Sequence, residues 1–251
     1  MIILDRSTVT ELQLNTHYEI YRNKLMKIDY KRYRGLGEVN LRRFIHHGTR
    51  YGLDAKLPTV RDIACVIYLM SQIGSYFYED PRFVHLHRIL QDHASENPAR
   101  LQRVTRAFDE MLDHYPSLDT KNIGATLAAY RDRVNALPAS VDHAEIVSVW
   151  ATSIGVKRPD DVAILQRVFP AHARQAARYL GVTQEEGERI CLNLALWLGI
   201  GFYKDPVYPW IRDVPGKESG EAAKTQALRV YVDKRFENQL KAFAELRNDD
   251  E

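Results

Sequence analysis

Apolar positions along this chain recur at intervals of three and four residues, the spacing of one buried face of an α-helix. Strand-like alternation is nearly absent. The two longest apolar runs, residues 63–73 and 190–198, each predict a buried helix. The pattern therefore predicts an all-α fold, with further helices over 38–51, 120–137 and 140–154. A last amphipathic helix carries the stripe Leu228, Val232, Phe236, Leu240 and Phe243.

Both long apolar runs end in the same motif. Residues 74–81 read Gly-Ser-Tyr-Phe-Tyr-Glu-Asp-Pro and residues 199–206 read Gly-Ile-Gly-Phe-Tyr-Lys-Asp-Pro, with five of eight positions identical at a constant offset of 125. Upstream, residues 50–53 resemble residues 178–181. Repetition at a fixed spacing predicts two related helical lobes, 1–115 and 116–251, the second including the C-terminal helix. The repeated motif positions are Gly74, Phe77, Asp80, Pro81, Gly199, Phe202, Asp205 and Pro206.

Residues at the predicted helix ends support this division into elements. Thr59, with Asp62 three positions later, is typical of an N-cap, and Gly74 and Gly199 are typical of helix ends. In each motif copy, Asp followed by Pro predicts a helix that restarts with the Asp side chain as its N-cap.

Two further signals predict helix starts and breaks. Capping boxes are expected at residues 8–11 and 183–186. A short helix is expected to open at Arg158-Pro159-Asp160, and the chain is expected to kink at Phe169-Pro170 into the next helix. The polar stretch 114–119 is the expected boundary between the lobes.

Composition excludes several functional classes. The 251 residues are 45% hydrophobic and 27% charged, as in ordinary globular proteins, and the net charge of +2 argues against a nucleic-acid partner. The apolar runs are too short for a membrane span, and residues 1–6 are too short for a signal peptide. We therefore expect a cytoplasmic protein. Cys65 and Cys191 lie within the apolar runs, so both are expected to be buried free thiols.

Recognisable chemistry is lacking in the sequence. The nine histidines have no chelating spacing on a regular helix, and none of the usual hydrolase, metalloprotease, P-loop or dinucleotide motifs occurs. The segment Gly199-Ile200-Gly201 follows a helix, whereas a dinucleotide loop would precede one. We expect no catalytic residue, cofactor or metal, and no enzymatic activity.

Aromatic residues gather at both motif copies. Their simplest role is to pack a turn between two helices. A second hypothesis adds protein binding through Tyr203, Tyr208 and Trp210 in the richer second copy, because Trp and Tyr dominate interface hot spots.

The region from residue 17 to residue 90 resembles a family of small all-helical bacterial proteins encoded beside type VI secretion genes for spike, PAAR, effector and effector-adaptor proteins. In that family the turn reads roughly Gly-x-x-Phe-x-x-Asp-Pro-x-x-Pro-Trp. The second copy matches throughout, whereas Val84 and His85 replace Pro-Trp in the first. The matching context is Leu36-Gly37-Glu38, Leu41-Arg42, His47-Gly48, Arg50-Tyr51-Gly52, Arg61-Asp62, Leu69-Met70, Gly74, Phe77 and Asp80-Pro81-Arg82.

This resemblance implies an accessory role, as a cytoplasmic adaptor or chaperone-like protein that binds an effector, or the effector's adaptor, for loading on the secretion spike. The alternative is an immunity protein that neutralises a toxin by binding it. An enzyme without a recognisable motif and a purely structural repeat module remain open.

Overall fold

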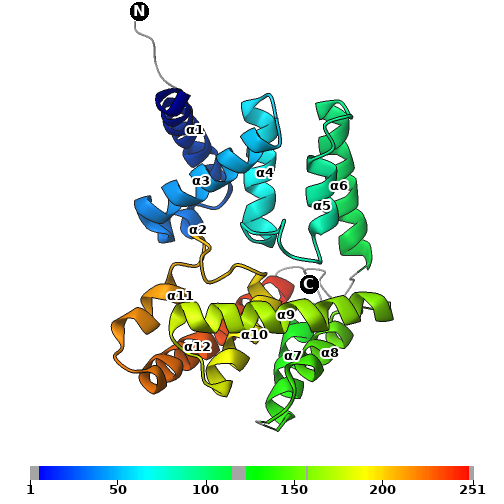
Figure 1. Cartoon of the computed structure of the whole chain (residues 1–251), viewed down its shortest axis with the longest axis vertical. Helices are drawn as coiled ribbons and strands as arrows, with labels where there is room; N and C mark the ends of the chain where they lie inside the picture. Colours follow the sequence, from blue (N-terminus) through cyan, green and yellow to red (C-terminus); the bar gives the residue numbers. More distant parts are fainter. Residues whose placement is uncertain (1–5, 115–122, 139, 157, 249–251) are drawn as a thin grey trace, which may run out of the picture. The chain divides into compact units, whose positions relative to one another are not determined.

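All regular structure in the described part of the chain is helical. The computed structural model describes residues 6–114, 123–138, 140–156 and 158–248, and no strand occurs in these ranges (Figure 1). The predicted fold class is therefore confirmed. The helices are α1 (Arg6–Ile28), α2 (Tyr30–Gly35), α3 (Gly37–Asp54), α4 (Val60–Ile73), α5 (Val84–Leu90), α6 (Asn97–His114), α7 (Ile123–Ala136), α8 (His143–Ser153), α9 (Pro159–Leu180), α10 (Glu185–Leu198), α11 (Trp210–Asp213), the 3-10 helix η2 (Pro215–Lys217) and α12 (Glu221–Asn248).

The helices form two compact units. The first contains Met1–Val104 and also the short segment Lys204–Pro209, and the second contains Thr105–Tyr203 and Trp210–Glu251. Most of the expected boundary at 114–119 lies outside the described residues. The segment 204–209, which includes Asp205 of the second motif copy, thus packs with the first unit.

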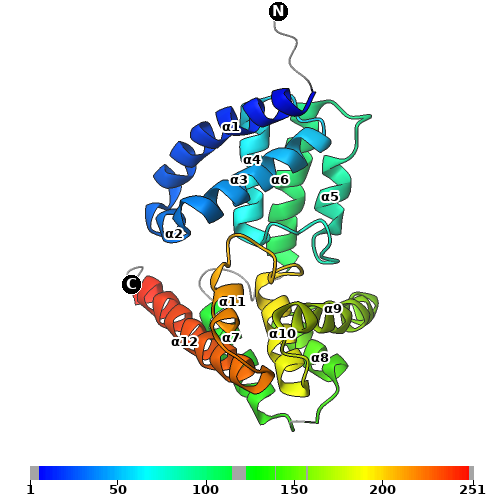
Figure 2. The same cartoon turned by 60° about the vertical axis from the view of Figure 1, so that its left-hand side comes forward.

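Close helix packing forms the core of the first unit, where α3 lies against α1 and α4 (Figure 2). Gly48 and Gly52 of α3 face α4 without a side chain. A Cβ atom at Gly48 would lie 2.6 Å from Ile67 Cγ1, and one at Gly52 would lie 2.9 Å from Ile63 Cγ1. These two glycines therefore allow a helix contact that a larger residue would obstruct.

Local capping signals define α4 as the sequence predicts. The Thr59 hydroxyl accepts a hydrogen bond from the Asp62 amide, and the Asp62 carboxylate accepts one from the Thr59 amide, both at 3.2 Å. This reciprocal pair is a capping box. Gly74 ends the helix at a φ of 96°, a conformation that glycine adopts without steric cost.

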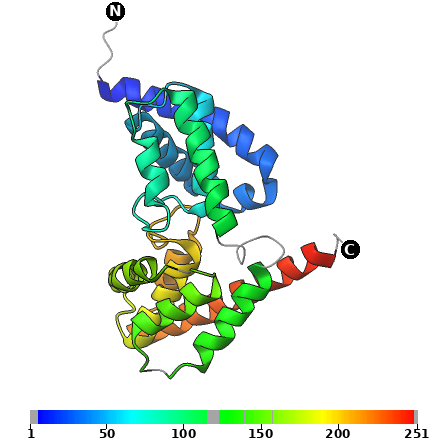
Figure 3. The same cartoon turned by 90° about the vertical axis from the view of Figure 1, so that its right-hand side faces the viewer.

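The second unit is built around α9 and α10, with α7, α8 and α12 also packed in it (Figure 3). The predicted division into two helices at Phe169-Pro170 is wrong, because the single helix α9 runs from Pro159 to Leu180 with Pro170 inside it. Pro170 is itself buried with Phe169 and Ala173, so packing of this face offsets the backbone hydrogen bond that a proline cannot donate.

Two predicted capping boxes are wrong. Helix α1 already begins at Arg6, so Thr8 lies inside it. The N-cap of α10 is Gln184, which makes no side-chain cap. Instead Glu221 of α12 accepts hydrogen bonds from the Gln184 amide, at 2.7 Å, and from the Thr183 hydroxyl, at 2.8 Å. A side chain distant in sequence replaces the local cap.

Among the helices of the described residues, none combines the length and the apolar character that crossing a membrane requires.

Candidate functional site

Each motif copy begins at a glycine that ends a long helix with nearly the same backbone geometry. Gly74 has φ 96° and ψ 148°, and Gly199 has φ 94° and ψ 161°. The amide of each donates to a helix carbonyl four residues earlier, at 3.0 Å. Gly199 is therefore a helix C-cap, as predicted.

A tyrosine of the upstream repeated block packs on the turn in each unit. In the first unit the ring centroids of Tyr51 and Tyr78 are 5.3 Å apart. In the second unit those of Tyr179 and Tyr203 are 5.1 Å apart. Phe77 and Phe202, at equivalent positions, are both buried and lie edge-on to the following tyrosine. The repeated sequence blocks therefore place equivalent tyrosines in contact within each unit, with the rings stacked at 19° in the first and tilted at 55° in the second.

The acidic residue of each copy is buried, but neither is a helix N-cap. Helix α5 begins at Val84 with Phe83 as its N-cap. The Asp80 carboxylate instead accepts hydrogen bonds from the amide, Nε and NH2 of Arg82, at 3.0, 2.9 and 2.6 Å. Asp205 likewise accepts from the amide two residues later, that of Val207, at 2.9 Å. The N-cap prediction is wrong because each side chain closes its own turn locally.

Asp205 also binds the start of the first motif copy. Its carboxylate accepts from the Ser75 amide and from the Ser75 hydroxyl, both at 2.7 Å. His47 Nε2 donates to the Ser75 carbonyl at 3.1 Å. Burial raises the pKa of Asp205, and the hydrogen bonds from Val207 and Ser75 oppose this shift. Burial also lowers the pKa of His47.

The arrangement of Ser75, His47 and Asp205 is not that of a catalytic triad. The serine hydroxyl donates to the aspartate, whereas the histidine binds the serine's backbone carbonyl. A nucleophilic serine instead needs the histidine nitrogen as the acceptor of its hydroxyl proton. Ser75 is also fully buried. This geometry orients a turn and assembles no nucleophile with its base.

A histidine and tyrosine cluster surrounds this turn within the first unit. The His47 ring lies 4.8 Å from that of Tyr76 and 6.2 Å from that of Tyr78. The Tyr51 hydroxyl lies 2.7 Å from His87 Nδ1. Burial lowers the pKa of His87 and raises that of Tyr51. His47 Nε2, the Tyr51 hydroxyl and His87 Nδ1 thus form hydrogen bonds within the unit.

Equivalent positions of the two motif copies meet in one ion pair. Lys204 and Glu79 occupy the sixth position of their copies, and Lys204 Nζ lies 3.2 Å from Glu79 Oε1. The same ammonium lies 4.2 Å from the centroid of the Tyr76 ring. Charge and ring contacts therefore add to the Asp205 hydrogen bonds that position the segment 204–209.

Two of the three predicted protein-binding residues are buried. Tyr203 is 5% exposed and Trp210 is 9% exposed. The Trp210 ring stacks on Tyr231 of α12 at 5.1 Å, and the Arg235 guanidinium lies 5.4 Å from its centroid. Trp210 is thus an intramolecular packing residue and not an exposed anchor. Tyr208 is half-buried and is the least covered of the three, although burial of its hydroxyl end raises its pKa, so only part of the side chain faces solvent.

The two cysteines differ in exposure. Cys191 is buried as predicted, and burial raises its pKa to about 12. Cys65 is exposed, so the prediction for this residue is wrong. On α4, Ile63, Val66 and Ile67 take the buried face, and Cys65 lies on the opposite side.

Sequence reasoning missed the partners of Asp205. Ser75 lies 130 residues away and differs from Ile200, its counterpart in the second copy. In the sequence, His47 stands out only as one of nine histidines and as part of the segment that resembles the bacterial family. The repeat itself was the available signal, because it placed Asp205 and Ser75 in related turns without indicating that they touch.

No group of three His, Cys, Asp or Glu side chains suited to a metal ion occurs among the residues described. Comparisons of the chain with protein-family models, with curated proteins and with solved structures find no match.

Proposed function

We propose that this chain is a cytoplasmic adaptor or chaperone-like protein of a type VI secretion system, which binds an effector or the effector's adaptor before export. The observation that carries the proposal is the second turn, whose Gly199, Phe202, Asp205, Pro206 and Pro209-Trp210 match the family pattern throughout. The roles of these residues in folding agree with a scaffold that presents surfaces to a protein partner.

Burial of the turn supports a binding protein over an enzyme. Asp80 and Asp205 are both nearly inaccessible, and their carboxylates accept hydrogen bonds from within the chain. A catalytic carboxylate must instead reach a substrate. We therefore assign partner binding to the outer surface, with Tyr208 as the contact residue next to the turn.

We also infer that the two units arose by duplication. Support comes from the matching backbone angles of Gly74 and Gly199 and from the repeated ring contact of Tyr51 with Tyr78 and of Tyr179 with Tyr203. A duplicated helical unit provides two related surfaces, and divergence of the second turn toward Pro209-Trp210 would suit it to a separate task.

The test is deletion of the gene in a strain with an active secretion system, with three measurements made together. If the chain is an adaptor, the deletion should lower effector secretion and the killing of competitors, while the producing strain stays healthy. Restoration by the wild-type gene is the control. Self-poisoning with secretion unchanged would identify an immunity protein and reject the adaptor role.

The contact surface is tested by Tyr208→Ala, with Tyr68→Ala as the matched control at an exposed tyrosine of the same unit. The bound effector or adaptor is first identified by mass after affinity capture. Tyr208→Ala should weaken the free energy of binding between this partner and the chain by about 2 kcal/mol, the size of a hot-spot loss, whereas Tyr68→Ala should not. Equal affinities for both variants would reject Tyr208 as a contact.

A further inference from the structure

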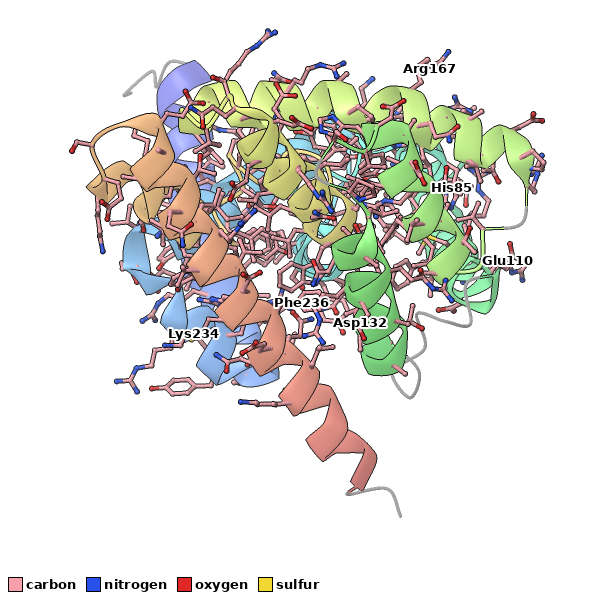
Figure 4. All side chains as sticks on the ribbon, turned by 90° about the horizontal axis from the view of Figure 1, so that it is seen from below. His85, Glu110, Asp132, Arg167, Lys234 and Phe236 are labelled. Carbon is pink, nitrogen blue, oxygen red and sulfur yellow. The ribbon has the colours of Figure 1, made fainter. Side chains whose placement is uncertain are left out.

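The solvent-facing side of α9 carries a row of arginines. Arg167, Arg174 and Arg178 are all exposed, and at 3.6 residues per turn they fall within an arc of about 40°. The row spans eleven residues, or about 16 Å along the helix. Figure 4 shows Arg167 at the outer edge of α9. These residues lie opposite the buried side that contains Leu165, Phe169 and Ala173.

None of these three guanidinium groups is neutralised within the described residues. Other arginines of the same unit are paired: Arg229 with Glu186 at 2.6 Å, and Arg189 with the carbonyls of Val134 and Pro138. The α9 row makes no such ion pair or hydrogen bond. In a chain whose net charge is only +2, this is a local concentration of unpaired positive charge.

The row is bordered by apolar side chains and ends at a carboxylate. Ile164 is 40% exposed and lies about 60° from Arg167 around the helix. Tyr179 is 59% exposed, but it lies about 100° from Arg178 and its ring also contacts that of Tyr203. Ala171 lies between Arg167 and Arg174, and its small side chain lets a partner approach the helix closely at this point. Asp160, seven residues before Arg167, is exposed on the same arc. The face therefore reads acidic, basic, basic, basic from its N-terminal end, with apolar contacts beside it.

We propose that this face of α9, defined by Asp160, Arg167, Arg174 and Arg178, binds an acidic α-helical segment of a protein partner. Three partner carboxylates face the arginines, whose planar forks bind carboxylates through paired hydrogen bonds. A basic side chain of the partner faces Asp160, and this pair fixes the direction in which the partner helix lies along α9. Ile164 contacts an apolar side chain of that segment.

Nucleic acid fits this face less well, because the Asp160 carboxylate would meet the phosphate chain and repel it. Exposed aliphatic and aromatic side chains also suit a protein surface with an apolar centre. The inference does not rest on the proposed secretion role, since the binding measurement below needs only the purified chain.

The probe is a synthetic helical peptide of the length of α9, which is 22 residues. It repeats the spacing of the four charged positions, with Glu opposite each arginine, Lys opposite Asp160 and Leu on the flanks. A peptide of the same composition in scrambled order is the control. Fluorescence anisotropy with the full chain should give an affinity at least about tenfold higher for the patterned peptide, an advantage that falls as salt is added.

Two variants locate the binding, and Arg106→Glu is their matched control, because Arg106 is an exposed arginine on α6 of the same unit. Arg174→Glu and Asp160→Lys should each weaken binding of the patterned peptide by about tenfold or more, whereas Arg106→Glu should change it by less than about twofold. Circular dichroism confirms that each variant remains folded, and Arg174→Gln provides a milder second test.

Several outcomes overturn the proposal. One is equal binding of the patterned and scrambled peptides, which would indicate charge attraction alone. Another is tighter, Arg174-dependent binding of a single-stranded RNA of equal charge, which would assign the face to nucleic acid. A third is a dimer of the free chain that Arg174→Glu dissociates, which would assign it to a second copy.

Discussion

Asp205 accepts two hydrogen bonds from Ser75, one from its backbone amide and one from its hydroxyl, and both distances are 2.7 Å. The two residues are 130 positions apart in the sequence. Because the Val207 amide donates to the same carboxylate, one side chain both closes the turn of the second motif copy and attaches it to the end of α4. The aspartate is 2% exposed, so its carboxylate is shielded from bulk solvent.

Asp205→Ala should therefore destabilise the protein by about 3 kcal/mol or more, because leaving each buried donor unpaired costs about 1–3 kcal/mol. Urea unfolding followed by circular dichroism measures this loss. Asp109→Ala, at an exposed aspartate, is the control and should change stability by less than about 0.5 kcal/mol. A loss no larger than that of a single cap, about 1 kcal/mol, would show that the Ser75 contact contributes little.

Acid should weaken the first unit through its histidines. Burial lowers the pKa of His17, His46, His47 and His87, all of which belong to this unit. The unfolded chain takes up protons near the ordinary value of about 6.5, while the folded chain does not, so the free energy of unfolding falls as the pH drops through that value. Asp205 acts in the opposite direction at lower pH. Its raised pKa lets the folded chain take up a proton first, so its contribution to stability increases as the pH falls toward the ordinary aspartate range.

Unfolding free energies at a pH of about 7.5 and about 5.5 bracket the histidine window. His47→Gln and His87→Gln should each reduce the difference between the two values, and His143→Gln, at a half-buried histidine of the second unit, is the matched control. Identical differences in all four proteins would mean that these rings do not control acid stability.

Local signals explain why part of the fold could be predicted. The capping box of Thr59 and Asp62 and the helix-ending glycines depend on neighbouring residues, and the structure confirms both. Asp205 followed by Pro206 is an equally local signal, yet the N-cap that it predicts is wrong, because an Asp side chain can close a turn as readily as it can cap a helix. Sequence alone does not distinguish the two.

Tertiary packing explains most of what could not be predicted. Glu221 replaces the predicted cap of α10 from a helix 37 positions away in sequence. The apolar run of α4 predicts a buried helix, yet it does not determine that Cys65 lies on the exposed side. Tryptophan is typical of interface anchors, and only the position of α12 shows that Tyr231 covers Trp210. Each of these errors concerns a contact between distant segments.

Thiol labelling should separate the two cysteines. Cys65 is exposed, whereas Cys191 is buried with a pKa of about 12, so at neutral pH its reactive thiolate is scarce and covered. One equivalent of a thiol reagent should react quickly with the native protein, and the second should react only after unfolding. Cys65→Ser should remove the fast phase. Two fast equivalents in native wild-type protein would contradict the burial of Cys191.

Trp210 gives the clearest contrast between packing and recognition. Its ring is 9% exposed, stacked on Tyr231 and covered by Arg235, so Trp210→Ala should destabilise the second unit by about 3–5 kcal/mol, the usual loss for a buried aromatic residue. Trp210→Phe keeps most of the stacked area and should cost much less. Urea unfolding with circular dichroism as the signal compares the two, since tryptophan fluorescence is itself altered. If Trp210→Ala kept its stability but lost the captured partner, the residue would be an interface anchor after all, and its stacking on Tyr231 would contribute little to the fold.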